Sequence, residues 1–450
     1  MSSATGLTPV IDINSRRSSR GGWMATFAAA NVQAAGRTLS PVRVFMWTFA
    51  VFTAGLCVAP VTPDVPISAT AVVYWAAVVV FAMIGAAIGS PSGYATTQGG
   101  LFKVRTFQVR TLARRCIWIG ALGVMLSAVD RFVIRGAPLG LDFFAAREAV
   151  ADAGSGPIGV IAAATSSFAA FGVVSTWLAR ALGQPMSRLE EVAAAAALIV
   201  YLLLSVMLGS RSVLLVCASV HLMAGVFLQK LKNGRIEWRT IMIVAGVLLL
   251  LTGASAWLIL ERLDEMGLSP VDSIQLSAYA YTVQPSQSLV AALESSPRLG
   301  YFGAALYSLV LYVYHGFYEF CLLFTSYASP HLYGADTLWL PLKLVGMVTG
   351  RNLEVDLDDL VGARAGIYTT FVGPLFLDFG WLAPAFGLLL FLGLAYPFRR
   401  VACGDWRWFA AAVQVAVIIV IAPVVSLLDS SAGTFPLLAA LAMPLLARRS

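Results

Sequence analysis

Long, unbroken apolar runs constrain this chain more than any other feature of its sequence. Two of them, Val192–Leu208 and Ile241–Leu260, contain no charged side chain. A helix of about 20 apolar residues crosses the hydrocarbon core of a bilayer, whereas a membrane β-barrel shows roughly ten-residue segments of alternating polarity. Only 12% of the 450 residues are charged, against about 25% in soluble domains. The sequence therefore predicts an all-α, polytopic membrane protein, and it excludes a coiled coil, a disordered chain and a nucleic-acid-binding domain.

Hydropathy predicts ten transmembrane helices and divides the chain into four parts. Residues 1–40 form a polar, disordered tail, residues 41–260 a first bundle of seven helices, residues 261–368 one large external segment, and residues 369–450 three C-terminal helices. The predicted spans are 44–60, 67–89, 116–134, 157–179, 192–209, 213–229, 240–260, 369–398, 408–428 and 432–447.

Basic residues assign the sides of the membrane. The tail, the C-terminus and the loops after spans two, four, six and eight carry 21 of the 30 Lys and Arg residues. Cytoplasmic loops of membrane proteins are enriched in these residues. We therefore expect a multi-pass protein of the cytoplasmic membrane with both termini in the cytoplasm.

The predicted external segment has the opposite charge. Residues 261–368 hold 11 of the 23 acidic side chains and five basic ones, a net charge of −6. Two apolar stretches lie inside it, 301–327 and 338–348. Either both cross the membrane, which gives twelve helices, or both lie along or dip into the outer leaflet. The density of tyrosine in the first stretch favours the second arrangement, because aromatic side chains gather at membrane interfaces.

The segment that leads into the eighth span combines several polar groups. Within residues 362–381 it carries Arg364, two threonines, Pro374 and Asp378. Pro374 removes a helix donor, so a broken or kinked helix is expected there. An acidic residue inside a span is a functional candidate by default. The alternative is that Asp378 caps or pairs to hold helices together, and that Arg364 only reaches the interface.

A short turn between spans five and six gives a second candidate. Arg211 lies in Gly209–Ser212, flanked by two serines. A guanidinium binds phosphate in a bidentate manner, and the amides at the start of a helix add to an anion site. The alternative is an ordinary hairpin turn with an interfacial arginine.

His315 and Glu319 form the third candidate. They are four residues apart and share one helix face, and an imidazole titrates near neutral pH. The alternative for His315 is an interfacial hydrogen bond. Because the pair has no third ligand, we expect no metal and no cofactor. Elsewhere, the neighbours Asp130 and Arg131 are expected to form a structural pair.

These residues give the chain a resemblance to bacterial oligosaccharide repeat-unit polymerases, the Wzy-type O-antigen and exopolysaccharide polymerases. The features that carry it are Gly209–Ser212 between paired spans, the late external segment with residues 314–320, and residues 362–380 leading into a span. The O-antigen ligases share the same plan. The resemblance covers the architecture from about residue 40 onward.

The resemblance implies a glycosyltransferase that works on the outer face of the membrane. The donor would be an oligosaccharide on undecaprenyl pyrophosphate, and the acceptor another lipid-linked repeat unit. Arg211 and Arg364 would bind the pyrophosphate, helped by Arg298 or Arg351. Such a donor is already activated, so neither metal nor nucleotide would be required.

The remaining roles follow from the same resemblance. His315 or Asp378 would take the proton of the acceptor hydroxyl. The residues expected to contact sugar are Tyr314, Tyr318, Glu319 and Tyr368.

Several functions remain open at this point. A ligase would transfer glycan to another acceptor, and a flippase would move the lipid-linked sugar across the membrane. The ionisable groups gather on one predicted face, which favours an enzyme over a flippase. A non-catalytic assembly partner is the last alternative. Expected partners are membrane lipid, a chain-length regulator and a flippase of the same pathway, and no nucleic acid.

Overall fold

The computed structural model describes most of the chain. It covers residues 40–90, 109–137, 156–207, 211–233 and 269–447, the last with gaps at 277, 296, 352, 354, 356, 365–366 and 368, and isolated positions at 239, 242, 246 and 267. The predicted tail (1–40) and the predicted span 240–260 lie almost entirely outside the described residues.

The described part is all-α apart from one small β-ribbon, as predicted. Eight helical segments within it are long and apolar enough to cross a membrane, which identifies an all-α polytopic membrane protein. Seven of the eight coincide with predicted spans, and the eighth, Phe302–Ser326, lies in the predicted external segment. Two further predicted spans coincide with shorter helices, so nine of the ten have a described counterpart. These two shorter helices have 16 residues each: Trp406–Ile421 and Ser431–Leu446.

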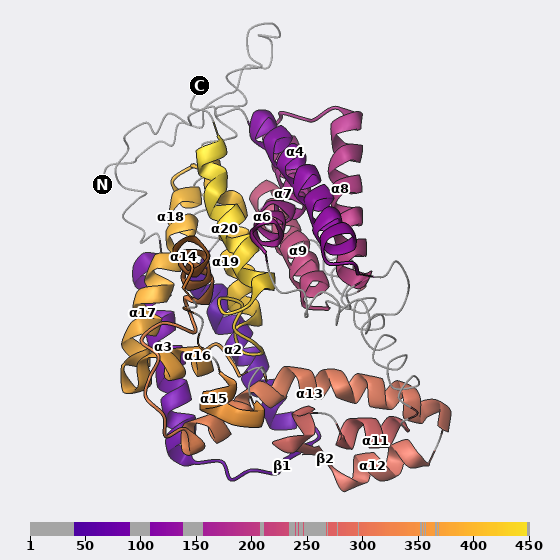
Figure 1. Cartoon of the computed structure of the whole chain (residues 1–450), viewed down its shortest axis with the longest axis vertical. Coiled ribbons are helices and arrows are strands. Elements are labelled where there is room, and N and C mark those ends of the chain that lie inside the picture. Colours follow the sequence, from indigo (N-terminus) through magenta and orange to yellow (C-terminus); the bar gives the residue numbers. More distant parts are fainter. Residues whose placement is uncertain are drawn as a thin grey trace, which may run out of the picture.

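The N-terminal half is a set of upright helices (Figure 1). Prolines begin two of them, at Pro41 and Pro157, where a missing amide hydrogen costs nothing. The elements are α2 (Pro41–Val58), α3 (Ala69–Gly89), α4 (Val109–Ala128) with its π-helical continuation η2 (Val129–Ile134), α6 (Pro157–Ser166), α7 (Phe168–Ala181), α8 (Arg188–Met207) and α9 (Arg211–Asn233).

The middle of the chain has a different arrangement, and all of its elements except α14 lie at the lower end of Figure 1. Its elements are α11 (Pro270–Gln275), η3 (Ala278–Tyr281), α12 (Gln287–Glu294), α13 (Pro297–Ser326), α14 (Trp339–Thr349), α15 (Asp358–Val361) and η4 (Gly362–Arg364). The strands β1 (Val61–Pro63) and β2 (Val283–Pro285) pair in antiparallel fashion and tie this region to the α2–α3 loop.

Two elements of this region correspond to the apolar stretches whose placement the sequence leaves open. Figure 1 shows α13 lying crosswise beneath the upright helices. Helix α14 instead packs into the bundle, where its Leu340 meets Val160 of α6 and Phe435 of α20.

The C-terminal part supplies the centre of the bundle. Its elements are α16 (Val372–Phe379), η5 (Gly380–Leu382), α17 (Ala383–Leu394), α18 (Tyr396–Ala402), η6 (Trp406–Trp408), α19 (Phe409–Ile421) and α20 (Ser431–Leu446). Nearly every residue of α19 is buried. A helix that is apolar on all sides and buried on all sides is a core helix, so α19 is the element around which α2, α7, α9 and α20 pack.

The helix break near Pro374 falls later than expected. Pro374 lies in the first turn of α16, where proline is tolerated. The chain breaks at Gly380, whose φ of +51° favours glycine. A Cβ there would also meet the ring of His331. Asp378 therefore lies at the end of a short helix rather than beside a kink in a long one.

The predicted pair of Asp130 with Arg131 is wrong. Asp130 instead binds Arg135 at 2.9 Å, and Arg131 donates to the carbonyl of Leu204 in α8 at 3.0 Å. Neighbouring residues of a helix point in different directions, whereas Asp130 and Arg135 are five apart at the π-helical end of α4. The Arg131 contact ties the end of α4 to α8, and the Asp130–Arg135 pair stays within the π-helical end itself.

Candidate functional site

A cavity of about 430 Å³ lies between α13, the turn before α14, η4 and the bend before α20. Its wall is half apolar, with leucines from α13, α15 and α16. Four ionisable side chains also line it: Glu319, Asp336, Arg364 and Asp429. Ligand pockets combine a mostly apolar wall with a few polar groups of this kind.

Arg364 and Glu319 are paired at one wall of the cavity. The guanidinium contacts both carboxylate oxygens of Glu319, with Nε 3.3 Å from Oε2. Thr282 donates a third hydrogen bond to Glu319 at 2.9 Å, and the guanidinium lies 4.6 Å above the ring of Tyr281. The Glu319 side chain is only 4% exposed. The cation is therefore held in place, neutralised and still open to the cavity.

Asp378 supports the wall of the cavity through its neighbours. Its two oxygens accept the amide hydrogens of Asp336 and Thr337, at 2.9 and 2.8 Å, and its carbonyl accepts that of Tyr333 at 2.8 Å. The side chain is fully buried. Because both oxygens are occupied, the carboxylate fixes the turn before α14, which is the capping role considered as the alternative for this residue.

Asp336 and Asp429 face the cavity from two different loops. Burial raises the pKa of Asp336 to about 7, and the charge of Asp378 adds to the shift. Burial also raises the pKa of Asp429 well above its ordinary value, with Asp336 and Asp378 contributing. Like charges in a shared site disfavour ionisation. The cavity thus contains one carboxyl group, that of Asp336, that can exchange a proton near neutral pH.

His315 lies on α13 but does not line the cavity. Its Nδ1 is 2.9 Å from the carbonyl of Leu311, and its ring packs against Tyr279 with centroids 4.2 Å apart. The side chain is fully buried, and its Nε2 has no hydrogen-bond partner among the described residues. Glu319, one turn later, points into the cavity instead.

The remaining predicted site residues are dispersed. Tyr314 packs on Phe52, with ring centroids 5.3 Å apart, and Tyr318 is 6% exposed in the core. Arg351 is exposed after α14. Tyr368 and the side chains of Arg211 and Arg298 lie outside the described residues.

The segment before α16 is held tightly against three helices. The amide of Thr370 donates to Gly316 of α13 at 3.3 Å, and that of Phe371 donates to Ala422 at 3.0 Å. Trp75 of α3 donates to the Thr370 hydroxyl at 3.0 Å. This anchoring positions η4 and α16, and with them Arg364 and Asp378, relative to the bundle.

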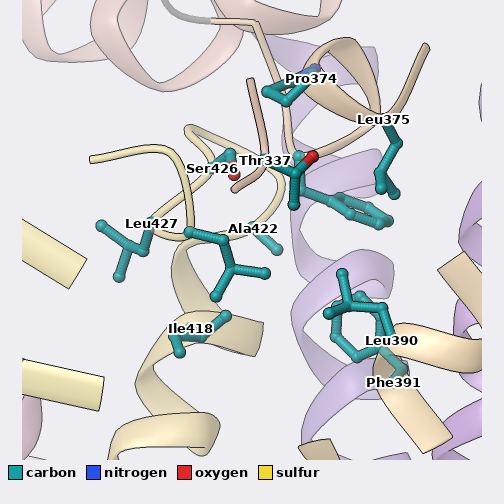
Figure 2. Close-up of a pocket in the computed structure, with 11 residues that line it drawn as sticks. Thr337, Pro374, Leu375, Leu390, Phe391, Ile418, Ala422, Ser426 and Leu427 are labelled. Atoms are coloured by element: carbon teal, nitrogen blue, oxygen red, sulfur yellow. The ribbon is translucent and has the colours of Figure 1, made fainter. Parts of the chain in front are cut away.

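A narrow apolar crevice adjoins this region (Figure 2). It lies between α16 and α17 on one side and α19 with residues 426–428 on the other. Figure 2 shows Thr337 and Ser426 at the same end as Pro374, with Ile418, Leu390 and Phe391 deeper inside. Its volume of about 10 Å³ holds roughly one water molecule, so the larger cavity is the candidate ligand site.

Sequence reasoning missed Asp336, Asp429, Thr282 and Tyr281. The two aspartates are 93 residues apart in the sequence and lie in loops that meet only in the folded chain. Neither belongs to a recognisable sequence motif. Their only sequence signal is an acidic side chain next to an apolar helix. No group of three or more potential metal ligands is found among the described residues.

Comparison of the chain with family models, with curated proteins and with solved structures finds no match.

Proposed function

We propose that this protein is a polysaccharide polymerase, a membrane glycosyltransferase that joins undecaprenyl-pyrophosphate-linked repeat units on the outer face of the cytoplasmic membrane. One observation carries the proposal: a cavity at one end of an apolar bundle has a leucine-rich wall beside Arg364 and three carboxyl groups. A lipid with a charged, sugar-bearing headgroup has the matching chemistry. The ionisable groups of this cavity lie at one end, which favours an enzyme over a flippase.

The distribution of arginines supports the proposed orientation. Arg110, Arg114, Arg115 and Arg180 contact Glu190, Leu446 and Glu191, which join α4, α7, α8 and the end of α20. Figure 1 shows these helices meeting at the upper end, whereas α13 and α15, which line the cavity, lie at the lower end. By the positive-inside rule the upper end is cytoplasmic. In this orientation the cavity opens toward the outer face, which agrees with the proposed cytoplasmic position of both termini.

Arg364 is proposed to bind the pyrophosphate of the donor. A diphosphate offers a guanidinium more charge than the single carboxylate of Glu319, so Arg364 would exchange one partner for the other. Arg211 and Arg298 remain proposed as further pyrophosphate ligands, and Arg351 as an outer one. Neutralising the leaving group lowers the barrier to its departure.

Asp336 is the proposed proton acceptor, in place of His315 and Asp378. It lines the cavity, and its pKa of about 7 suits a general base at neutral pH. The acceptor hydroxyl oxygen attacks the anomeric carbon, the bond from that carbon to the pyrophosphate oxygen breaks, and the hydroxyl proton passes to the Asp336 carboxylate. Lipid pyrophosphate leaves with the bonding electrons.

The test uses the full chain in nanodiscs with lipid-linked repeat units from a host that lacks this chain. Arg364→Ala is expected to lose about 10²-fold or more in polymerisation rate, and Asp336→Asn about 10²-fold or more. Arg180→Ala, at the opposite end, is the matched control. Full activity in both cavity variants would refute the assignment of this cavity. Transfer only to a different acceptor would indicate a ligase.

A further inference from the structure

The first half of α13 has two faces of different character. Gly300, Ala304, Tyr307 and Leu311 are buried on one face. A Cβ at Gly300 would lie 2.7 Å from the carbonyl oxygen of Leu293 in α12. Residues three and four apart share a helix face, so this glycine-containing face is where α12 packs closely against α13.

The opposite face of α13 is apolar and uncovered. Phe302 is 63% exposed and Leu306 is 40% exposed. They are four residues apart and roughly half a helical turn away from the buried face. In addition, residues 299–318 contain no Asp, Glu, Lys or Arg. In water this face would leave apolar surface hydrated, which is unfavourable by about 25 cal/mol per Å².

The arrangement of the helices decides which way this face points. Figure 1 shows α13 crosswise at the lower end, with α11 and α12 on its far side from the upright helices. The Phe302–Leu306 face is thus turned away from α12. The membrane helices also expose apolar side chains, such as Val51 and Val58 of α2.

We propose that the N-terminal half of α13 is an interfacial membrane helix, whose Phe302–Leu306 face inserts among the acyl chains of the adjacent leaflet. The bilayer surface is its partner, because the exposed face is apolar, the stretch 299–318 carries no charge, and the helix belongs to a chain with several membrane-length apolar helices. An amphipathic helix in this position buries its apolar face at the boundary between headgroups and acyl chains. The same helix carries Glu319 at its other end, so α13 links the lipid surface to the cavity.

The test places an environment-sensitive fluorophore on each side of this region. In the full chain, the exposed Cys57 and Cys403 are replaced by serine, and a single cysteine is introduced as Phe302→Cys or Leu306→Cys. Ser288→Cys on α12, which is also exposed, is the matched control. Each variant is labelled with NBD and reconstituted in phosphatidylcholine nanodiscs, and its thermal unfolding is compared with that of the parent.

Quenching from the two phases separates the outcomes. We expect labels at 302 and 306 to emit at shorter wavelength and to lose intensity with doxyl-labelled phosphatidylcholine, while the label at 288 loses intensity with aqueous iodide. Iodide quenching at all three positions would overturn the proposal, since the face would then be in water. Resistance to both quenchers would also overturn it, because protein rather than lipid would cover the face. Neither outcome depends on the proposed glycosyltransferase activity.

Discussion

Arginine–glutamate pairs occur at both ends of this molecule, and they differ in their surroundings. At the upper end in Figure 1, Arg110 and Arg114 bind Glu190, and Arg180 binds Glu191. These arginine side chains are 45–64% exposed. At the cavity, the Arg364 side chain is 23% exposed and that of Glu319 only 4%.

This difference in exposure gives the arginine–glutamate pairs at the two ends different roles. The exposed pairs join the ends of α4, α7 and α8, and in water each contributes about 0–1 kcal/mol. The cavity pair has lost most of its hydration, so removal of one partner leaves a buried charge. A ligand whose anionic group binds a guanidinium more strongly than a carboxylate does can displace Glu319 from Arg364. The exposed arginines need no such exchange, because they are already open to solvent.

The strongest test of this comparison removes one arginine from each end. Arg364→Ala is expected to lower the free energy of unfolding by about 3–5 kcal/mol, because Glu319 is left buried without its counter-ion. Arg180→Ala is expected to change it by about 0.5 kcal/mol or less. Thermal and denaturant unfolding in detergent measures both, and equal losses at the two ends would contradict the comparison.

A double variant separates stability from ligand binding. In Arg364→Met with Glu319→Gln, no charge remains buried, so most of the lost stability should return. Polymer formation should not return if Arg364 binds the pyrophosphate. Recovery of both would show that the pair is only structural.

A smaller effect is expected from Asp378, which holds the turn before α14. Asp378→Ala removes two charge-assisted hydrogen bonds, each worth about 1.5 kcal/mol, and frees the amides of Asp336 and Thr337. Asp378→Asn keeps the shape and one acceptor oxygen, so it should lose less. Unfolding of the two variants compares these effects, and an unchanged stability in Asp378→Ala would show that the turn does not depend on this carboxylate.

Much of the fold follows from the sequence, because apolar length determines a membrane helix almost alone. The predicted spans coincide with described helices wherever the structure covers them. The site was harder to predict, since it depends on contacts between distant segments. Arg364, Glu319 and Asp378 were identified as polar groups in apolar surroundings, whereas their partners, the backbone amides at 336–337 and the hydroxyl of Thr282, have no such signal.

The same cause explains why the sequence left two roles open for Asp378. The sequence shows an acidic side chain in an apolar segment, which fits a base or a cap, and only the folded chain shows that two amides donate to its oxygens. Asp336 was not predicted as a site residue, because it comes close to Asp378 and Asp429 only in the folded chain.

The carboxyl groups of the cavity predict how stability depends on pH. Asp336 and Asp429 have raised pKa values in the folded protein, so between about pH 4 and 7 the folded state binds more protons than the unfolded state. Their contribution is therefore present at low pH and is lost as the pH rises through the folded pKa. Wild-type protein should unfold at a lower temperature at pH 8 than at pH 5, by about 2–4 °C.

Asp429→Asn tests this assignment, because the amide cannot ionise. The variant should show a smaller difference between pH 5 and pH 8, whereas Asp64→Asn, at an exposed position, should behave as the wild type. Thermal unfolding across this pH range gives the result. A wild type that is more stable at pH 8 than at pH 5 would contradict this prediction, because ionised carboxylates would then stabilise the folded cavity.

The smallest expected change in stability comes from a substitution at the exposed end. Unlike a substitution at the cavity, it should depend on salt concentration. Glu190→Gln removes the carboxylate that Arg110 and Arg114 share, and we expect a loss of about 1 kcal/mol or less at low ionic strength. Because screening shortens the Debye length from about 10 Å at 0.1 M salt to about 3 Å at 1 M, this loss should shrink as salt is added. The loss in Arg364→Ala should change little, since a buried charge is poorly screened. Unfolding of both variants at 0.05 and 1 M salt would test the contrast, and a salt-sensitive Arg364→Ala would mean that the cavity pair is as hydrated as the exposed ones.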